Sequence, residues 1–226
     1  MPALPSPLPY TRTASAVFLL LLLLGPIVLV MLPSQVLVPG DAAATTTRVL
    51  AAVDSLRWGA LGELTIAISE LAMTLALYRL FARVQPDVAA LAALSRFGMA
   101  AIQAGGVAVS LGVLAAADQG LPDLVLWLLG AKEHVALAWQ GFFGIHCIAL
   151  GYLIARSGFV PRALGPLMAL AGLGYLVDTV GSMVAPSMGD VWGTVVAIGA
   201  LGGEVPFFVW LLVRGIDPVR WREAQP

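Results

Sequence analysis

The chain has 226 residues, of which 60% are apolar and only 11% are charged. An average soluble domain is about 45–50% apolar and about 25% charged, and a soluble domain of this length has too little interior to hide so many apolar side chains. The formal net charge is −1, which excludes the basic surface of a nucleic-acid-binding protein. The single cysteine, Cys147, excludes an intrachain disulfide bond. The composition therefore predicts an integral membrane protein.

Taken in chain order, six runs are apolar and long enough to cross a bilayer, which takes about 20 residues of helix. They cover residues 14–32, 58–80, 88–117, 134–155, 163–184 and 191–213. We therefore predict an all-α fold, a polytopic membrane helical bundle of six transmembrane helices plus short interfacial helices. The whole chain, residues 1–226, is predicted to form a single transmembrane domain.

Short segments flank and connect these spans. Residues 1–13 contain four prolines and are predicted to be a disordered tail, although the first apolar run can also be interpreted as a cleaved signal peptide. Residues 41–54 predict an extramembrane helix. Residues 121–131 are apolar but too short to cross, and Trp127 favours the headgroup level, so they predict an interfacial helix. Residues 215–226 predict a charged cytoplasmic tail.

The placement of arginine and lysine predicts the orientation of the bundle. One side of the predicted spans holds eight of them: Arg12, Arg79, Arg83, Arg156, Arg162, Arg214, Arg220 and Arg222. The other side holds three: Arg48, Arg57 and Lys132. Because positively charged loops stay in the cytoplasm, we expect both termini to be cytoplasmic.

Seven strongly polar side chains fall inside the predicted spans, where an ionised group costs about 2.5–3.5 kcal/mol on insertion scales. They are Glu63, Glu70, Arg96, Gln103, His146, Asp178 and Glu204. Such side chains normally face the bundle interior, a partner or water, and they often mark a functional site. The simpler alternative is that they pair with one another and only fix the register of the helices.

Helical spacing groups these polar side chains with aromatic ones. Glu63 and Glu70 are seven residues apart, as are Arg96 and Gln103, so each pair shares one helix face. The aromatic side chains that lie beside the polar ones at helical spacing are Trp139, Phe142, Phe143, Tyr175 and Phe207. We therefore predict one central polar pocket lined with aromatic rings.

The charge balance of this predicted pocket suggests acid–base chemistry. Four carboxyl groups face one arginine and one histidine, so at least one acid is expected to carry a proton, and a neutral acid in an apolar site can act as a general acid. His146 beside Cys147 lacks the spacing of metal ligands, and no phosphate loop, zinc-protease or serine-hydrolase motif occurs. We therefore expect neither a metal nor a cofactor.

A specific block of residues runs from the fourth span into the fifth. It consists of Phe143-Gly144-Ile145-His146, residues 150–162, and residues 171–178, and further matches lie at 41–43, 77–80, Arg96, Glu204 and 210–212. These residues resemble a bacterial family of six-span membrane proteins known as domain of unknown function 4386. The resemblance covers nearly the whole chain. It implies a protein of the bacterial inner (cytoplasmic) membrane in which Arg96, His146, Asp178 and Glu204 are shared family features, but it implies no activity.

The chain departs from the family pattern at two positions. Met99 stands three residues after Arg96, where the family often has an acid, and Glu63 stands where the family tends to have aspartate. The first departure removes a nearby partner for the arginine. We therefore expect Arg96 to pair with Glu204 or Asp178.

Our first hypothesis for function is a membrane-embedded enzyme that acts on a lipid-like or isoprenoid substrate, with chemistry like that of a terpene cyclase. Asp178 or Glu63 would protonate an alkene or epoxide, and His146 or Glu204 would take the proton back. The rings of Trp139, Phe142, Phe143, Tyr175 and Phe207 would stabilise a carbocation. The polar side chains expected to contact the substrate are Glu70, Arg96 and Gln103.

Two other classes of function fit the same residues. Intramembrane acids with a histidine also form proton relays, which is typical of a proton-coupled small-molecule transporter. A non-enzymatic sensor or binding protein would use the polar cluster only to hold the helices in register. The expected partners are membrane lipid, a hydrophobic small molecule and, as a homodimer, a second copy of the chain; no nucleic acid is expected.

Overall fold

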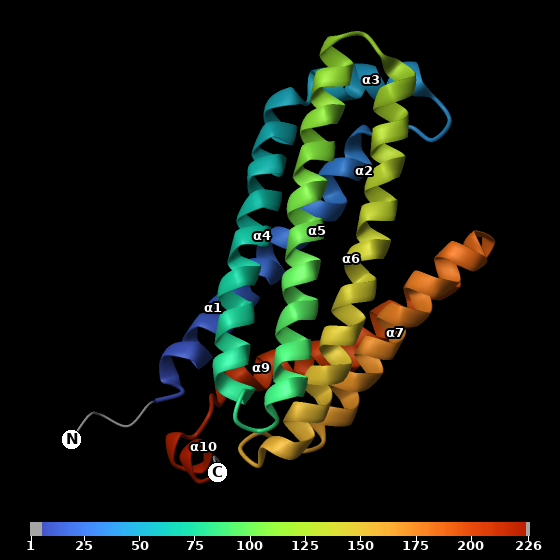
Figure 1. The fold of residues 1–226 in the computed structure, drawn as a ribbon. Coiled ribbons are helices and arrows are strands. Elements are labelled where there is room, and N and C mark those ends of the chain that lie inside the picture. Colours follow the sequence, from blue (N-terminus) through green and yellow to red (C-terminus); the bar gives the residue numbers. More distant parts are fainter. Residues whose placement is uncertain (1–5, 225–226) are drawn as a thin grey trace. The chain divides into compact units, whose positions relative to one another are not determined.

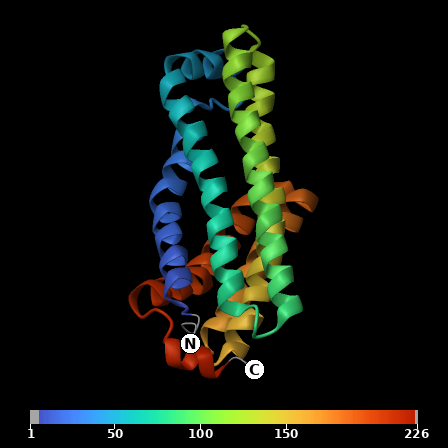
Figure 2. The same ribbon diagram turned by 60° about the vertical axis from the view of Figure 1, so that its left-hand side comes forward.

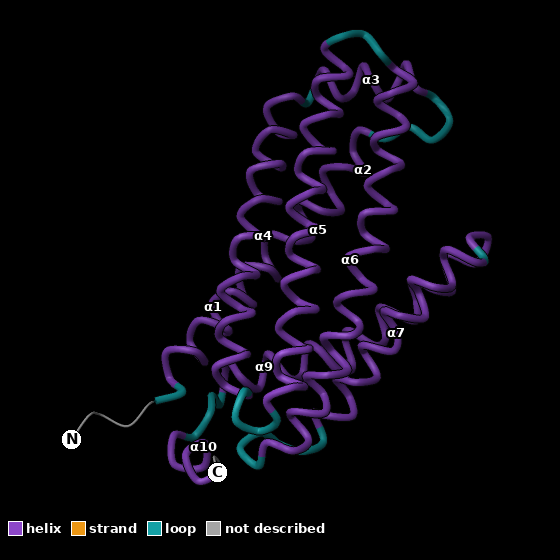
Figure 3. The backbone as a smooth tube through the Cα atoms, in the orientation of Figure 1, coloured by secondary structure: helices purple, strands orange, loops and turns teal. Residues whose placement is uncertain are grey.

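The computed structural model describes residues 6–224, and these form helices joined by short loops, without strands (Figures 1 and 3). The elements are α1 (Leu8–Gly25), η1 (Pro26–Met31), α2 (Leu32–Val36), α3 (Ala42–Ala51), α4 (Val53–Phe81), α5 (Pro86–Asp118), α6 (Pro122–Ser157), α7 (Leu164–Val184), η2 (Pro186–Met188), α8 (Gly189–Gly199), η3 (Ala200–Glu204), α9 (Val205–Val213) and α10 (Pro218–Glu223). The predicted all-α fold is confirmed.

Within residues 6–224, six helical segments are long and apolar enough to cross a membrane, as the sequence predicts. They are Leu8–Val36, Val53–Phe81, Pro86–Asp118, Pro122–Ser157, Leu164–Val184 and Pro186–Val213. The first and last of these are composite, because each contains a π-helical stretch, η1 or η3, between two α-helical parts. A helix satisfies the hydrogen bonds of its own backbone, which is why an apolar segment of this length that lies in hydrocarbon folds as a helix.

Two predicted segments are corrected by the structure. The tail predicted for residues 1–13 is too long, because α1 already begins at Leu8; residues 1–5 lie outside the described residues. The separate interfacial helix predicted for residues 121–131 is wrong, because those residues form the first turns of the continuous helix α6. Pro122 opens this helix at a position where its missing N–H costs nothing, and no further proline follows before Pro161.

The extramembrane helix predicted for residues 41–54 is α3. Asp41 caps it, since its Oδ1 accepts a hydrogen bond from the backbone N–H of Ala44 at 2.8 Å. The helix ends at Ala51, and α4 begins separately at Val53.

The charged C-terminal segment is anchored. Trp221 of α10 is buried, and its Nε1–H donates a hydrogen bond to the carbonyl oxygen of Leu80 at 3.0 Å. This bond holds α10, red in Figure 2, against the end of α4.

The two π-helical stretches share one cause. Each ends two residues before a proline, η1 before Pro33 and η3 before Pro206. A proline ring collides with the carbonyl group four residues earlier and has no N–H to bond it. The preceding turn widens instead, so that the N–H of Val205 reaches five residues back to the carbonyl of Ala200.

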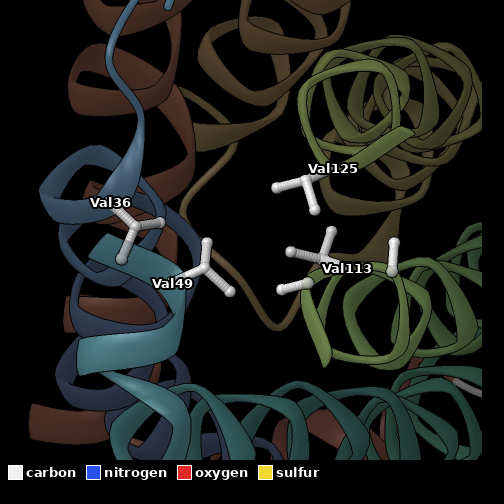
Figure 4. Close-up of a cluster of buried hydrophobic side chains, with 6 residues drawn as sticks. Val36, Val49, Val113 and Val125 are labelled. Carbon is white, nitrogen blue, oxygen red and sulfur yellow. The ribbon is translucent and has the colours of Figure 1, made fainter. Parts of the chain in front are cut away.

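The chain divides into two compact units that share the long helices α4, α5 and α6. Unit 1 comprises Met1–Phe18, Glu70–Met99 and Gln140–Pro226, and unit 2 comprises Leu19–Ser69 and Ala100–Trp139. Unit 2 has a small apolar core in which valines from four helices, α2, α3, α5 and α6, come together (Figure 4): Val36, Val49, Val113 and Val125. Two of these helices, α5 and α6, also carry polar residues of the second cluster described below.

In unit 1, α6 and α7 pack in direct backbone contact, because facing glycines remove the side chains between them. A Cβ added to Gly144 or Gly172 would lie within 2.8 Å of the other glycine's carbonyl oxygen. Gly151 and Gly165 repeat this arrangement seven residues along each helix. Small residues are what allow membrane helices to approach so closely.

Candidate functional site

The centre of unit 1 is an ion pair between α4 and α5. The guanidinium of Arg96 donates to Oε2 of Glu70 through Nε at 2.8 Å and through Nη2 at 2.6 Å. The side chain of Arg96 is 2% exposed and that of Glu70 is 5% exposed. The expectation that Arg96 pairs with Glu204 or Asp178 is therefore wrong: Glu70, on the neighbouring helix, is the partner.

His146 of α6 extends this pair and has both ring nitrogens occupied. Its Nδ1 lies 2.8 Å from the carbonyl oxygen of Ala92, which can only accept, so Nδ1 carries the proton. Its Nε2 lies 3.0 Å from Nη1 of Arg96, which can only donate, so Nε2 is the acceptor. The imidazole is thus neutral, with its lone pair committed to the arginine.

Aromatic rings cover this network on one side. The guanidinium carbon of Arg96 lies 5.4 Å from the centre of the Phe143 ring, a cation–π contact. Phe143 also stacks on His146 at 5.8 Å and meets the edge of Tyr175 at 4.9 Å. Its ring is therefore fully engaged with protein groups.

Tyr175 links the aromatic layer to the π-helical stretch. Its hydroxyl donates a hydrogen bond to Oε2 of Glu204, the last residue of η3, at 3.1 Å. Glu204 also lies within the electrostatic reach of Arg96 and Glu70. Unit 1 therefore gathers Glu70, Arg96, His146, Phe143, Tyr175 and Glu204 into one cluster, and the catalytic and substrate-binding roles expected of these residues stay predictions.

Asp178 lies one turn beyond Tyr175 on α7 and is 6% exposed. The hydroxyl of Ser182 donates to its Oδ1 at 3.0 Å. Two aromatic side chains of the predicted pocket lie elsewhere in unit 1. Phe207 is buried against Phe208, and Phe142 is 44% exposed and lies beside Gly98 of α5.

A second polar cluster lies in unit 2 and joins α4, α5 and α6. Glu63 is buried and forms an ion pair with the ammonium group of Lys132. Ser110 bridges the two, since its hydroxyl donates to the carboxylate oxygens of Glu63 at 3.0 and 2.9 Å and accepts from Lys132 at 2.5 Å. Two further residues of the predicted pocket belong to this unit, namely Gln103, which is half-buried, and Trp139.

Sequence reasoning missed Lys132, because it placed this residue in an outer loop. In the continuous helix α6, Lys132 lies ten residues after Pro122, and Glu63 lies ten residues after Val53 in α4. At 1.5 Å per residue both are about 15 Å from their helix ends. Opposite charges at equal depth in two spans were the signal available in the sequence.

The cavities beside the two clusters differ in size. A cavity of about 30 Å³ is lined by Glu63, Ser110 and Lys132 together with apolar residues such as Val28 and Leu129. It has room for about two water molecules. The cavity beside His146 in unit 1 is about 10 Å³, which is room for one water molecule at most.

The family model described as "Domain of unknown function (DUF4386)" matches residues 13–215. This chain belongs to that family. The match takes in both polar clusters, so the two clusters are part of the DUF4386 domain. It confirms the family to which the His146–Asp178 block points.

Another relative is similar over a shorter stretch. A protein of Archaeoglobus fulgidus, described as uncharacterized, is 38% identical over 76 residues, which is 33% of this chain and 42% of that protein. The chain thus matches less than half the length of that relative. No solved structure matches this DUF4386 protein.

Proposed function

We propose that this DUF4386 membrane protein is a proton-coupled transporter of a small solute, in which Glu63 binds and releases the proton and Lys132 is its partner. The observation that carries the proposal is the Glu63–Lys132 pair, which forms part of the wall of a water-sized cavity inside the spans. An acid and a base in contact with each other and with water can exchange a proton. A purely structural pair needs no such access.

The coupling step follows from the contacts. In the resting state Lys132 is an ammonium ion bonded to the Glu63 carboxylate and to Ser110. A proton that enters through the cavity neutralises Glu63 and weakens its attraction for Lys132. The ammonium group, whose side chain is 20% exposed, then turns towards the cavity. Loss of the proton to the other side restores the pair, so one proton moves in each cycle.

The two interrupted spans support transport. Many transporters build their sites from helices that are broken at membrane depth and expose unpaired carbonyl groups. Here the first and sixth spans each contain a π-helical stretch before a proline, and η3 carries the acid Glu204. Single π-helical turns within α-helices are frequent at functional sites.

An isoprenoid cyclase receives less support from the geometry. The face of Phe143 that would stabilise a carbocation is covered by Arg96, and the lone pair of His146 is held by the same arginine. The cavity beside His146 is about 10 Å³, whereas sites for ligands of drug size are about 300–1,000 Å³. Cells supplied with isoprenoid precursors offer a direct check. A new apolar product made by the wild type and not by Asp178→Asn would favour the enzyme over the transporter.

Proteoliposomes that enclose a pH-sensitive dye test the proposal. We would add amino acids, sugars, carboxylic acids and organic amines in turn and record the pH inside. At least one class should change the internal pH with the wild type, and Glu63→Gln should slow that change at least tenfold. Glu133→Gln is the matched control, because it removes the same charge from an exposed position next to Lys132. The proposal fails if no solute changes the pH, or if Glu63→Gln and Glu133→Gln behave alike.

We also propose that both termini face the cytoplasm of a bacterial inner membrane. The support is the uneven distribution of positive charge: the side that holds both termini has eight arginines, whereas the other side has two arginines and one lysine. Cysteine introduced at Gln119, in the exposed turn between α5 and α6, should react with an impermeant thiol reagent in whole cells. Cysteine at Arg222 should not react until the cells are opened. The opposite labelling pattern would reverse the orientation.

A further inference from the structure

A large open groove lies in unit 1 at the end where four spans begin or end. Its volume is about 850 Å³. The lining comes from the start of α1, the loop between α6 and α7, the end of α9 and the segment that leads into α10. The lining residues are Leu8, Gly158, Phe159, Val160, Pro161, Trp210, Arg214, Gly215, Ile216, Asp217, Pro218 and Arg220. The polar clusters of the proposed transporter contribute nothing to it.

The charged side chains of the groove favour an anion. Arg214 and Arg220 are exposed and line it. Among the described residues of the lining, the only acid is Asp217, and its Oδ1 already accepts hydrogen bonds from the backbone N–H groups of Val219 at 2.7 Å and Arg220 at 3.4 Å. Two guanidinium groups, whose planar N–H donors suit phosphate oxygens, are therefore left to face an incoming ligand.

The position of the groove places it at the membrane surface. The sixth span ends at Val213, so Trp210 lies in the last turn of the span and Arg214 is the first residue after the span. Tryptophan is enriched at the headgroup level, and arginine there contacts anionic lipids. The fourth span ends at Ser157, immediately before the lining residue Gly158.

The groove is built on fixed elements. Trp221 anchors α10 through its bond to Leu80 and is buried, which fixes the backbone that carries Arg220. Ile216 is 2% exposed, so the linker between α9 and α10 is also packed against the protein. A binding surface that is already ordered loses little entropy when a ligand arrives.

We propose that this groove binds the phosphate headgroup of an anionic phospholipid. The two arginines hold the phosphate, Trp210 lies at the level of the glycerol backbone, and the acyl chains extend along the apolar spans. The bound lipid fixes α10 and the start of α1 at the membrane surface. A zwitterionic lipid binds less well, because its own cation opposes the arginines.

Native mass spectrometry of the full chain in detergent, with phosphatidylglycerol or phosphatidylcholine added, tests the proposal. The wild type should retain phosphatidylglycerol at least tenfold more strongly than phosphatidylcholine. The double variant Arg214→Gln/Arg220→Gln should lose most of that preference, because each arginine removed should weaken the binding of phosphatidylglycerol about fivefold. The control Arg162→Gln/Arg222→Gln removes the same charge from the same end of the protein without touching the groove lining, and it should keep the preference.

Three results would overturn the proposal. The first is equal retention of the two lipids by the wild type, which needs no variant and therefore does not depend on the folding of any. The second is an equal loss of preference in the groove variant and its control, which would indicate surface charge alone. The third is a melting temperature that rises with millimolar inorganic phosphate but not with phosphatidylglycerol, which would make the groove a site for a soluble anion.

Discussion

Replacement of Arg96 by methionine should destabilise unit 1 strongly, because it leaves two buried groups without a partner. Glu70 loses both of its bonds from the guanidinium group, and Nε2 of His146 loses its donor. Removal of one member of a buried ion pair costs about 3–5 kcal/mol in soluble proteins. Hydrogen bonds between membrane helices are worth less, so we take the lower value, about 3 kcal/mol. For a chain of this size that corresponds to a fall in melting temperature of roughly 6–12 °C.

A second variant separates the ion pair from simple packing. Arg96→Met combined with Glu70→Leu removes both charges and fills the space with apolar atoms, so it should recover most of the lost stability. The control Arg79→Met removes an exposed arginine from the last turn of α4 and should change the melting temperature by less than about 2 °C. Thermal unfolding in detergent measures all three. The reasoning is refuted if Arg96→Met behaves like Arg79→Met, or if the double variant is no more stable than Arg96→Met.

Two further changes test the packing of unit 1. A Cβ at Gly203 would lie 2.0 Å from the carbonyl oxygen of Leu167, so Gly203→Ala should lower the melting temperature by several degrees. A Cβ at Gly202 would meet no neighbouring atom within 4 Å, so the control Gly202→Ala should leave the melting temperature unchanged. Equal melting temperatures for these variants would mean that α7 and η3 are not in close contact. Trp221→Phe removes the hydrogen bond to Leu80, worth about 1 kcal/mol, and should make α10 more accessible to proteases. Unchanged proteolysis would show that this bond does not anchor α10.

The number and approximate limits of the spans were predictable because the bilayer imposes them. A run of about 20 apolar residues has few alternatives to a membrane helix, and the six predicted runs lie within the spans of the structure apart from Ala163, which caps the fifth. The limits of α6 were not predictable in this way. The sequence Lys132-Glu133-His134 is polar enough to indicate a helix boundary, yet Lys132 stays inside the helix because Glu63 compensates its charge.

Membership of the polar cluster was easier to predict than its pairing. Spacing along one helix shows which residues share a face, but it does not show which helices touch. Arg96 lies ten residues after the start of α5, and Glu70 lies eleven residues before the end of α4. These two helices are consecutive and antiparallel, so residues at equal distance from their connecting turn lie at the same depth. Depth counted from the turn would have favoured Glu70 over Glu204 or Asp178 as the partner of Arg96.

The prolines were visible in the sequence, but the response of the helix was not. Pro33 and Pro206 predict a disturbance in the first and sixth spans, because each removes a backbone hydrogen bond. Whether a helix then kinks, breaks or widens depends on its neighbours. In unit 1, Gly203 allows η3 to approach Leu167 closely, and the wide turn places Glu204 against Tyr175.

Each cluster is built on a buried ion pair, and the two differ in their hydrogen-bond partners and in the room for water beside them. Around Arg96, both nitrogens of His146 and the Oε2 oxygen of Glu70 are engaged, and the neighbouring cavity holds one water molecule at most. A proton added to His146 must break its bond to Arg96 or to Ala92. Lys132 has three N–H donors and uses one for Glu63 and one for Ser110, beside a cavity with room for about two water molecules. Protonation of Glu63 weakens its bonds from Lys132 and Ser110, but the adjacent cavity has room for water that can bond the released ammonium group. This difference favours unit 2 as the place where proton transfer occurs.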